Sequence, residues 1–203
     1  MKIKILKNIK INIPFKEIYI RLGFNFYSTN ITEKEKEKID RAIILASSYC
    51  ELSGIWKIEN IIKKEEHKIF IESCYFESKN LFKFLENSNE ICILATTAGE
   101  KIVQYRDRLA KNNDMFNATI ADAVGSEMVE AYTDYIHSFI QKEISKYSKK
   151  LTKNRYSPGY GDLPLSYQKE IDKILNLNSI NVKVSKNFIL YPEKSITAFI
   201  GIE

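Results

Sequence analysis

The sequence predicts a single α+β domain with a twisted antiparallel sheet. Its 203 residues suffice for one substantial core, and 44% hydrophobic with 28% charged residues is ordinary globular composition. Segments with helical and strand periodicity are mixed along the chain, and the last three strand-like segments have short connections. Because no internal repeat and no Pro/Gly/Ser-rich linker divides the chain, we expect one domain over residues 1–203.

The N-terminal half is predicted to form short elements. Residues 1–13 alternate charged and apolar side chains, as a strand does. Pro14 and Gly23 bracket a short helix over residues 15–22. Thr32 and Glu35 make a capping box that starts a helix running to about Tyr49. The apolar face of that helix holds Ile39, Ile43, Ala46 and Tyr49. Three further elements are predicted after it: a strand over residues 67–77, a helix over 81–85 and a buried strand over 91–99.

The segment from residue 100 to about 147 is strongly helical, and one helix in it is long. Asp114 is predicted to cap that long helix and to divide the segment in two. A stripe at spacings of three or four predicts its core face: Ile120, Val124, Met128, Ala131, Tyr135 and Phe139. A separate row has members four residues apart: Asp122, Ser126, Glu130 and Asp134. From its pattern alone we interpret this row as a solvated acidic face.

The C-terminal elements follow a loop at residues 154–167. A helix over residues 166–176 is predicted, with Ser166 as its cap. Three strands are predicted to close the chain, over residues 180–185, 187–191 and 195–203.

Charge and cysteine usage narrow the class of protein. The net charge of +5 comes from interleaved lysines and glutamates, a pattern typical of a solvated surface rather than of a nucleic-acid-binding face. Three widely spaced cysteines and two distant histidines predict reduced thiols and no His/Cys metal site. The N-terminal residues lack the apolar region of a signal peptide, and no apolar run reaches 18 residues. We therefore expect a cytoplasmic protein without a membrane or nucleic-acid partner.

The loop NRYSPGYGDLPLSY holds two of the seven glycines and two of the four prolines in the chain. Pro158 followed by Gly159 predicts a type II turn, since glycine accepts the positive φ that this turn requires. Arg155 carries a planar fork for a carboxylate or phosphate, and Tyr160 a ring face with a hydroxyl. This combination fits a small zwitterionic or nucleotide-like ligand. The alternative is a plain connecting turn; the loop matches neither a GxGxxG nor a Walker pattern.

Three stretches resemble a known family. RYSPGY, residues 155–160, is similar to the RxxPGY signature of the S-adenosylmethionine-binding activation domain of vitamin B12-dependent methionine synthase. DMFNATIADAVGSEMVEAYTDYIH, residues 114–137, resembles the long helix of that domain, and YPEKSITAFIG, residues 191–201, resembles its closing strand. Residues 91–203 match better, whereas residues 1–90 match only in their coarse pattern of strands and helices.

The resemblance implies a site for S-adenosylmethionine (AdoMet). Arg155 would pair with the methionine carboxylate, and Glu130 would approach the amino group. Ser157 and Gly159 would provide backbone contacts, and Tyr160 would lie near the reactive methyl group. The resemblance implies no catalytic residue and no metal ligand in this chain; cobalamin would come only with a partner protein.

The resemblance also implies a role for the whole chain. In that family, AdoMet remethylates cobalamin that has been oxidised, with an electron from a flavodoxin-type donor. This sequence has no DxHxxG cobalamin pattern and no methyltransferase module. We therefore expect a reactivation module that acts in trans on a B12-dependent methionine synthase lacking this domain. The alternatives are an autonomous AdoMet-dependent methyltransferase and an accessory factor of another corrinoid protein.

A basic segment at residues 141–155 precedes the loop. It holds six basic residues and one acidic residue. It is either a solvated helix end, where lysines favour the negative end of the helix dipole, or a contact surface for an acidic partner.

Overall fold

The computed structural model describes residues 2–25 and 28–203, and within them the predicted α+β class is confirmed. One sheet has six strands in the order β4-β3-β2-β5-β8, with β1 on β2, and β6 and β7 form a second, small sheet. Every strand pair is antiparallel. The strands are β1 (Lys4–Lys7), β2 (Ser53–Glu65), β3 (Lys68–Ile71), β4 (Tyr75–Glu77), β5 (Glu90–Thr97), β6 (Lys183–Val184), β7 (Leu190–Tyr191) and β8 (Ser195–Ile202).

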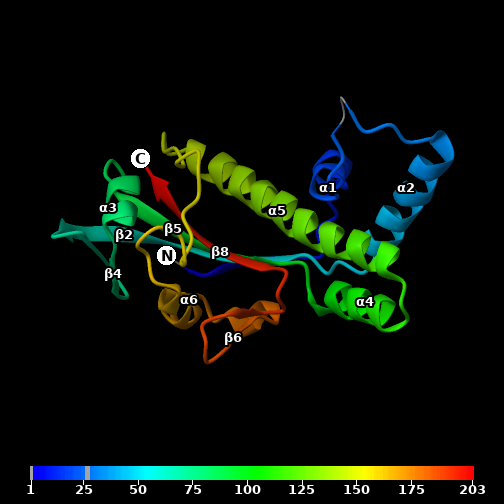
Figure 1. Ribbon diagram of the computed structural model, residues 1–203. Coiled ribbons are helices and arrows are strands. Elements are labelled where there is room, and N and C mark those ends of the chain that lie inside the picture. The colour runs from blue at the N-terminus through cyan, green and yellow to red at the C-terminus, as the bar shows by residue number, and fades with distance from the viewer. Residues whose placement is uncertain (1, 26–27) are drawn as a thin grey trace.

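The helices cover both faces of the large sheet (Figure 1). The α-helices are α1 (Phe15–Arg21), α2 (Glu33–Ser47), α3 (Lys79–Phe84), α4 (Glu100–Lys111), α5 (Met115–Ser145) and α6 (Gln168–Leu175). Two 3₁₀ turns, η1 (Leu165–Tyr167) and η2 (Leu177–Ile180), flank α6. The long helix α5 crosses one face of the sheet, and α6 lies on the opposite face together with the small sheet.

The central strand β5 shows how the sheet separates two cores. All eight of its residues are buried, because helices pack on both sides. Cys92 and Leu94 point into the core shared with α1, α2, α4 and α5. Ile91, Ile93 and Ala95 point into the core shared with α3, α6 and η2. The sheet is therefore the middle layer of three.

Several predicted boundaries were wrong. The N-terminal strand covers only Lys4–Lys7, because Asn8 takes a positive φ of 58° and turns the chain; Met1, where the predicted strand begins, lies outside the described residues. Residues 67–77 form a hairpin of β3 and β4 rather than one strand. The longest strand, β2, was not predicted, since its buried first half has apolar residues side by side instead of alternating.

The predicted helix starts had mixed outcomes. The capping box of Thr32 and Glu35 is present, and the Asp114 carboxylate accepts the Asn117 amide at the start of α5. Ser166 is not a cap: it lies in η1, and α6 begins after Tyr167 without a side-chain cap.

The predicted core stripe of α5 is confirmed in its first half and only in part in its second, where Phe139 is partly buried against the core. Ile120, Val124 and Met128 are buried, but Tyr135 is 38% exposed. In the second half the buried positions are instead Tyr132, Ile136, Ile140 and Ile144. Of the helices that the structure describes, none is both long enough and apolar enough to cross a bilayer.

Candidate functional site

The polar row of α5 is paired with basic side chains, although its carboxylates remain partly exposed. Near its start, Asp122 accepts hydrogen bonds from Arg106 of α4 at 2.9 Å and from Lys194 at 2.8 Å. Lys194 also donates to the Ser126 hydroxyl at 3.0 Å. The row therefore connects α5 to α4 and to the residues just before β8.

The second half of the row meets the loop of residues 154–167. Arg155 donates to Asp134 through Nη1 at 2.6 Å and to Glu130 through Nη2 at 3.4 Å. The Arg155 side chain is only 21% exposed, compared with 50% for Glu130 and 70% for Asp134. The row is thus solvated in part, as the pattern indicated, but basic partners distant in sequence also fold against it, which the pattern did not predict.

The segment that carries Arg155 runs along the free edge of β8. Tyr156 and Phe199 exchange backbone hydrogen bonds of 2.9 and 2.7 Å, and Leu151 forms a second bridge to Ile202. The edge of the sheet thus holds Arg155 next to α5, since residues on either side of the arginine are attached to the outermost strand.

The turn at Pro158 has the predicted features. The Tyr160 amide donates to the Ser157 carbonyl at 3.2 Å, and Gly159 has a φ of +93°, as a type II turn requires. The Gly159 amide donates to the Leu163 carbonyl at 2.8 Å. Any backbone contact from Gly159 to a ligand would therefore use its carbonyl.

The end of the loop is attached to helix α3. The Asp162 carboxylate accepts the amides of Lys79 at 2.7 Å and Asn80 at 3.2 Å, and also the Ser78 hydroxyl. These hydrogen bonds satisfy amides at the start of α3 that have no partner within the helix, and they hold the pKa of Asp162 below its usual value. The loop is therefore fixed at both ends.

A cavity of about 500 Å³ lies between α5, this loop and the start of β8. Four of the five predicted site residues line it: Glu130, Arg155, Ser157 and Tyr160. Gly159 forms the turn between two of them. The sequence prediction missed the other lining residues, which are Asp134, Lys153, Asn154, Tyr156 and Ile196. Asp134 had a signal, since it stands one helical turn after Glu130 in the polar row.

Burial and charge shift the pKa values of Glu130, which lines the cavity, and of His137, which lies near Arg155 but does not line the cavity. The pKa of Glu130 is raised, mainly by burial, and further by Asp134 and Glu127, although Arg155 opposes the shift. The pKa of His137 is lowered, first by burial and then by the positive charge of Arg155. A carboxyl with a shifted pKa in a concave site, such as Glu130, is a candidate for a functional role.

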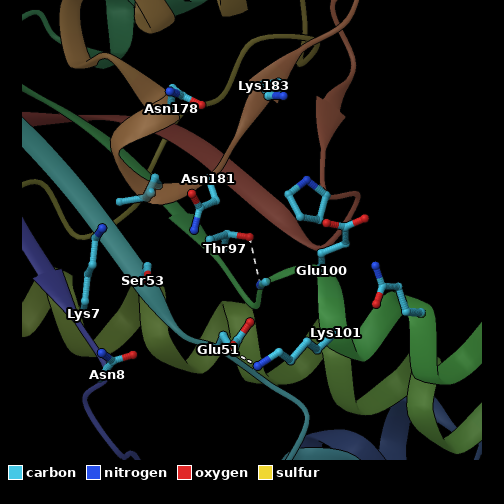
Figure 2. A pocket seen from close by; sticks show the side chains of 14 residues that line it. Lys7, Asn8, Glu51, Ser53, Thr97, Glu100, Lys101, Asn178, Asn181 and Lys183 are labelled. Atoms are coloured by element: carbon cyan, nitrogen blue, oxygen red, sulfur yellow. Dashed lines mark hydrogen bonds and ion pairs between the residues drawn. The ribbon is translucent and has the colours of Figure 1, made fainter.

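A larger cavity, of about 620 Å³, lies where β1, β2 and β5 approach the start of α4 (Figure 2). None of the predicted site residues lines it. In Figure 2, Lys101 points to Glu51, with which it pairs at 2.7 Å, and the Thr97 hydroxyl accepts the Gly99 amide at 3.0 Å. We take the smaller cavity as the candidate site, because it joins an arginine, two carboxylates and an aromatic ring.

The fold and this cavity define a class: an α+β domain with a charge-paired cavity at one sheet edge. Residues 77–202 match the family model described as vitamin B12 dependent methionine synthase, activation domain. The chain therefore belongs to this activation-domain family, as the three stretches of sequence indicated.

The chain is also similar to the crystal structure of the MetH reactivation domain bound to AdoHcy. The TM-score is 0.71, with 99% of this chain and 78% of that chain covered, at 12% sequence identity. At this identity the likeness concerns the fold, which extends the agreement to the N-terminal residues outside the family match.

Proposed function

We propose that this chain binds AdoMet in the cavity between α5 and the loop, and presents it to the cobalamin of a partner methionine synthase. The observation that carries the proposal is the contact of Arg155 with two carboxylates of α5 inside a cavity. Membership of the activation-domain family supports it, and so does a structural neighbour that is bound to AdoHcy.

The residues present fit the ligand. AdoMet carries a carboxylate, an ammonium and a sulfonium, so its site needs both signs of charge. Arg155 supplies a donor fork, and Glu130 and Asp134 supply acceptors. A cavity of about 500 Å³ lies within the usual range for sites of small ligands, which is roughly 300–1,000 Å³.

Each residue would then have a separate task. Arg155 would bind the methionine carboxylate, and Glu130 would accept from the ammonium group. Tyr160, whose side chain is 68% exposed, would lie near the methyl group at the open side of the cavity. Ser157 and Gly159 would orient the ligand through their backbone. When bound, AdoMet supplies the methyl group; the chain itself would bind it, orient it and leave the methyl accessible.

The partner follows from the same logic. The methyl acceptor in this family is cobalamin, and the sequence contains no pattern for binding it. We propose that a B12-dependent methionine synthase without its own activation domain provides the cobalamin, and that a flavodoxin-type donor provides the electron. The basic segment of residues 141–155, next to the cavity, is the surface that we assign to an acidic partner.

Calorimetry with AdoMet and with AdoHcy tests the binding site. Arg155→Ala should weaken AdoMet binding by about 2–5 kcal/mol, because it removes the partner of a charged group in a partly buried site. Arg41→Ala is the matched control, since it breaks an exposed arginine–glutamate pair on α2, far from the cavity. Absence of heat with millimolar AdoMet and wild-type chain would rule out the ligand.

A reconstitution tests the action in trans. Cobalamin-loaded methionine synthase lacking an activation domain is mixed with a one-electron reductant and AdoMet, and the absorbance change from cob(II)alamin to methylcobalamin is followed. The chain should accelerate this change, and Arg155→Ala and Glu130→Gln should slow it. Equal rates with and without the chain would reject the trans-acting role, and methyl transfer to small acceptors without the partner would favour an autonomous methyltransferase.

A further inference from the structure

Arg155 has a carboxylate partner within the chain itself. Its contact with Asp134, at 2.6 Å, is much shorter than its contact with Glu130, at 3.4 Å. A distance of 3.4 Å is at the weak limit for a hydrogen bond, so Asp134 is the main partner. A ligand carboxylate that uses the same fork therefore has to compete with Asp134.

The burial of the two groups indicates which one can move. The Arg155 side chain is 21% exposed and is attached through its backbone neighbours to the edge of β8. The Asp134 side chain is 70% exposed and reaches the arginine from the rim of the cavity. An exposed carboxylate regains water when it leaves its partner, so its release costs little free energy.

We propose that Asp134 is an internal competitor that occupies Arg155 until the carboxylate of the ligand replaces it. This inference rests on the proposed function, because it concerns the same cavity. It makes Asp134 a residue that sets affinity and selectivity rather than a passive member of an ion pair. When Arg155 binds the ligand carboxylate, Glu130 and Asp134 both lose a positively charged partner. Their negative charges are compensated only if the ligand also brings positive charge.

The exchange predicts a difference between two ligands. AdoMet has an ammonium and a sulfonium to offer the released carboxylates, whereas AdoHcy (S-adenosylhomocysteine, the product after methyl loss) has only the ammonium. Asp134 would thus penalise AdoHcy more than AdoMet. Removing the charge of Asp134 should therefore raise the affinity for AdoHcy more than the affinity for AdoMet, because AdoMet also loses a carboxylate near its sulfonium.

The test measures the dissociation constants of both ligands for wild type and Asp134→Asn. AdoHcy should bind the variant about twofold to fivefold tighter, the gain expected from freeing Arg155 from an exposed ion pair. The ratio of AdoHcy to AdoMet dissociation constants should fall. Asp107→Asn is the matched control, because Asp107 is an exposed carboxylate paired with a different arginine, Arg106.

A double-mutant cycle separates competition from a general change in the cavity. In the Arg155→Ala background, Asp134→Asn should bring no gain, since there is no arginine to release. A gain that persists there, or weaker or unchanged AdoHcy binding in Asp134→Asn alone, would overturn the inference and leave the proposed function intact. If wild type binds neither AdoMet nor AdoHcy, the proposed function fails and the inference with it.

Discussion

At Gly161 the loop passes so close to α3 that a side chain would clash unless its neighbours moved. A Cβ atom there would lie 2.4 Å from the side-chain nitrogen Nδ2 of Asn80 and 2.6 Å from the Tyr156 hydroxyl oxygen, and the backbone has a positive φ of 54°. At Gly159, whose φ is +93°, the nearest atom is a flexible Leu165 methyl carbon at 3.3 Å. Both positions favour glycine because their φ is positive, but only Gly161 also lacks space for a Cβ atom.

We therefore expect Gly161→Ala to destabilise the chain more than Gly159→Ala does. Both variants should lose about 1–2 kcal/mol from the left-handed backbone, and Gly161→Ala should lose more because Asn80 and Tyr156 must shift. Urea unfolding measures the difference. Equal losses in the two variants would show that the contact with α3 is not significant.

Glu130 is expected to cost stability in return for ligand binding. The pKa of Glu130 is raised in the folded chain by burial and by neighbouring carboxylates, so the folded state favours the protonated side chain. The folded chain is therefore most stable below the unfolded pKa of this group, and it loses stability as the pH rises through the folded pKa. Glu130→Gln should therefore unfold at higher urea concentration than wild type at pH 7, with the difference vanishing near pH 4. Glu37→Gln, on the exposed face of α2, is the control and should bring no such gain. A loss of stability at pH 7 in Glu130→Gln would contradict this reading.

At the scale of elements, α5 works as a connector through its polar row. The N-terminal part of the row binds α4 and the segment before β8, and the C-terminal part binds the ligand loop. The start of β8 and the loop are thus both attached to the same helix, which also lines the cavity. The position of the site thus depends on contacts one and two turns away from it.

Asp122→Asn should destabilise this arrangement. The Lys194 side chain is only 12% exposed and would lose its charged partner on α5 while keeping Ser126 and Glu193, so the loss should be about 0.5–1.5 kcal/mol, the net worth of one hydrogen bond. Thermal unfolding reports the loss. Asp107→Asn is the control: it leaves the contacts between α5, α4 and Lys194 intact and should change stability by less than about 0.5 kcal/mol, as exposed pairs do. A similar loss in both variants would show that the polar row does not hold these elements together.

At the scale of the molecule, the cavity opens beside the basic segment. Lys146, Lys150 and Lys153 are exposed, whereas Lys149 pairs with Glu90 of the sheet, whose side chain is 11% exposed. The exposed lysines are thus available to a partner, and Lys149 has a role in holding the chain after α5. A docking variant should consequently spare Lys149.

Reversing the charge of Lys146 and Lys150 to glutamate should slow the remethylation in trans without changing AdoMet affinity. The effect should be largest at low ionic strength and should shrink as salt screens the docking step. The rate is measured at two salt concentrations with the partner held constant. An effect on AdoMet affinity, or a rate loss independent of salt, would exclude this segment as the docking surface.

The sequence by itself determined the features that depend on neighbouring residues. The capping box at Thr32, the cap at Asp114 and the turn at Pro158 each require only a few adjacent positions, and all three were predicted. The family could also be recognised, because its signature is a contiguous motif around Arg155. Ser166 shows the limit, since a residue with capping chemistry does not cap when a 3₁₀ turn precedes the helix.

The tertiary structure decided everything that depends on distant partners. It placed Lys194 on Asp122 across 72 residues, and it paired Arg155 with Asp134 across 21. The same row of α5 would be a solvated face on an isolated helix, and it becomes a connector only when β8 and the loop fold against it. The physical reason is that a carboxylate on a helix surface has no intrinsic role: its hydrogen-bond partner and its burial are set by which other segment the fold brings to it.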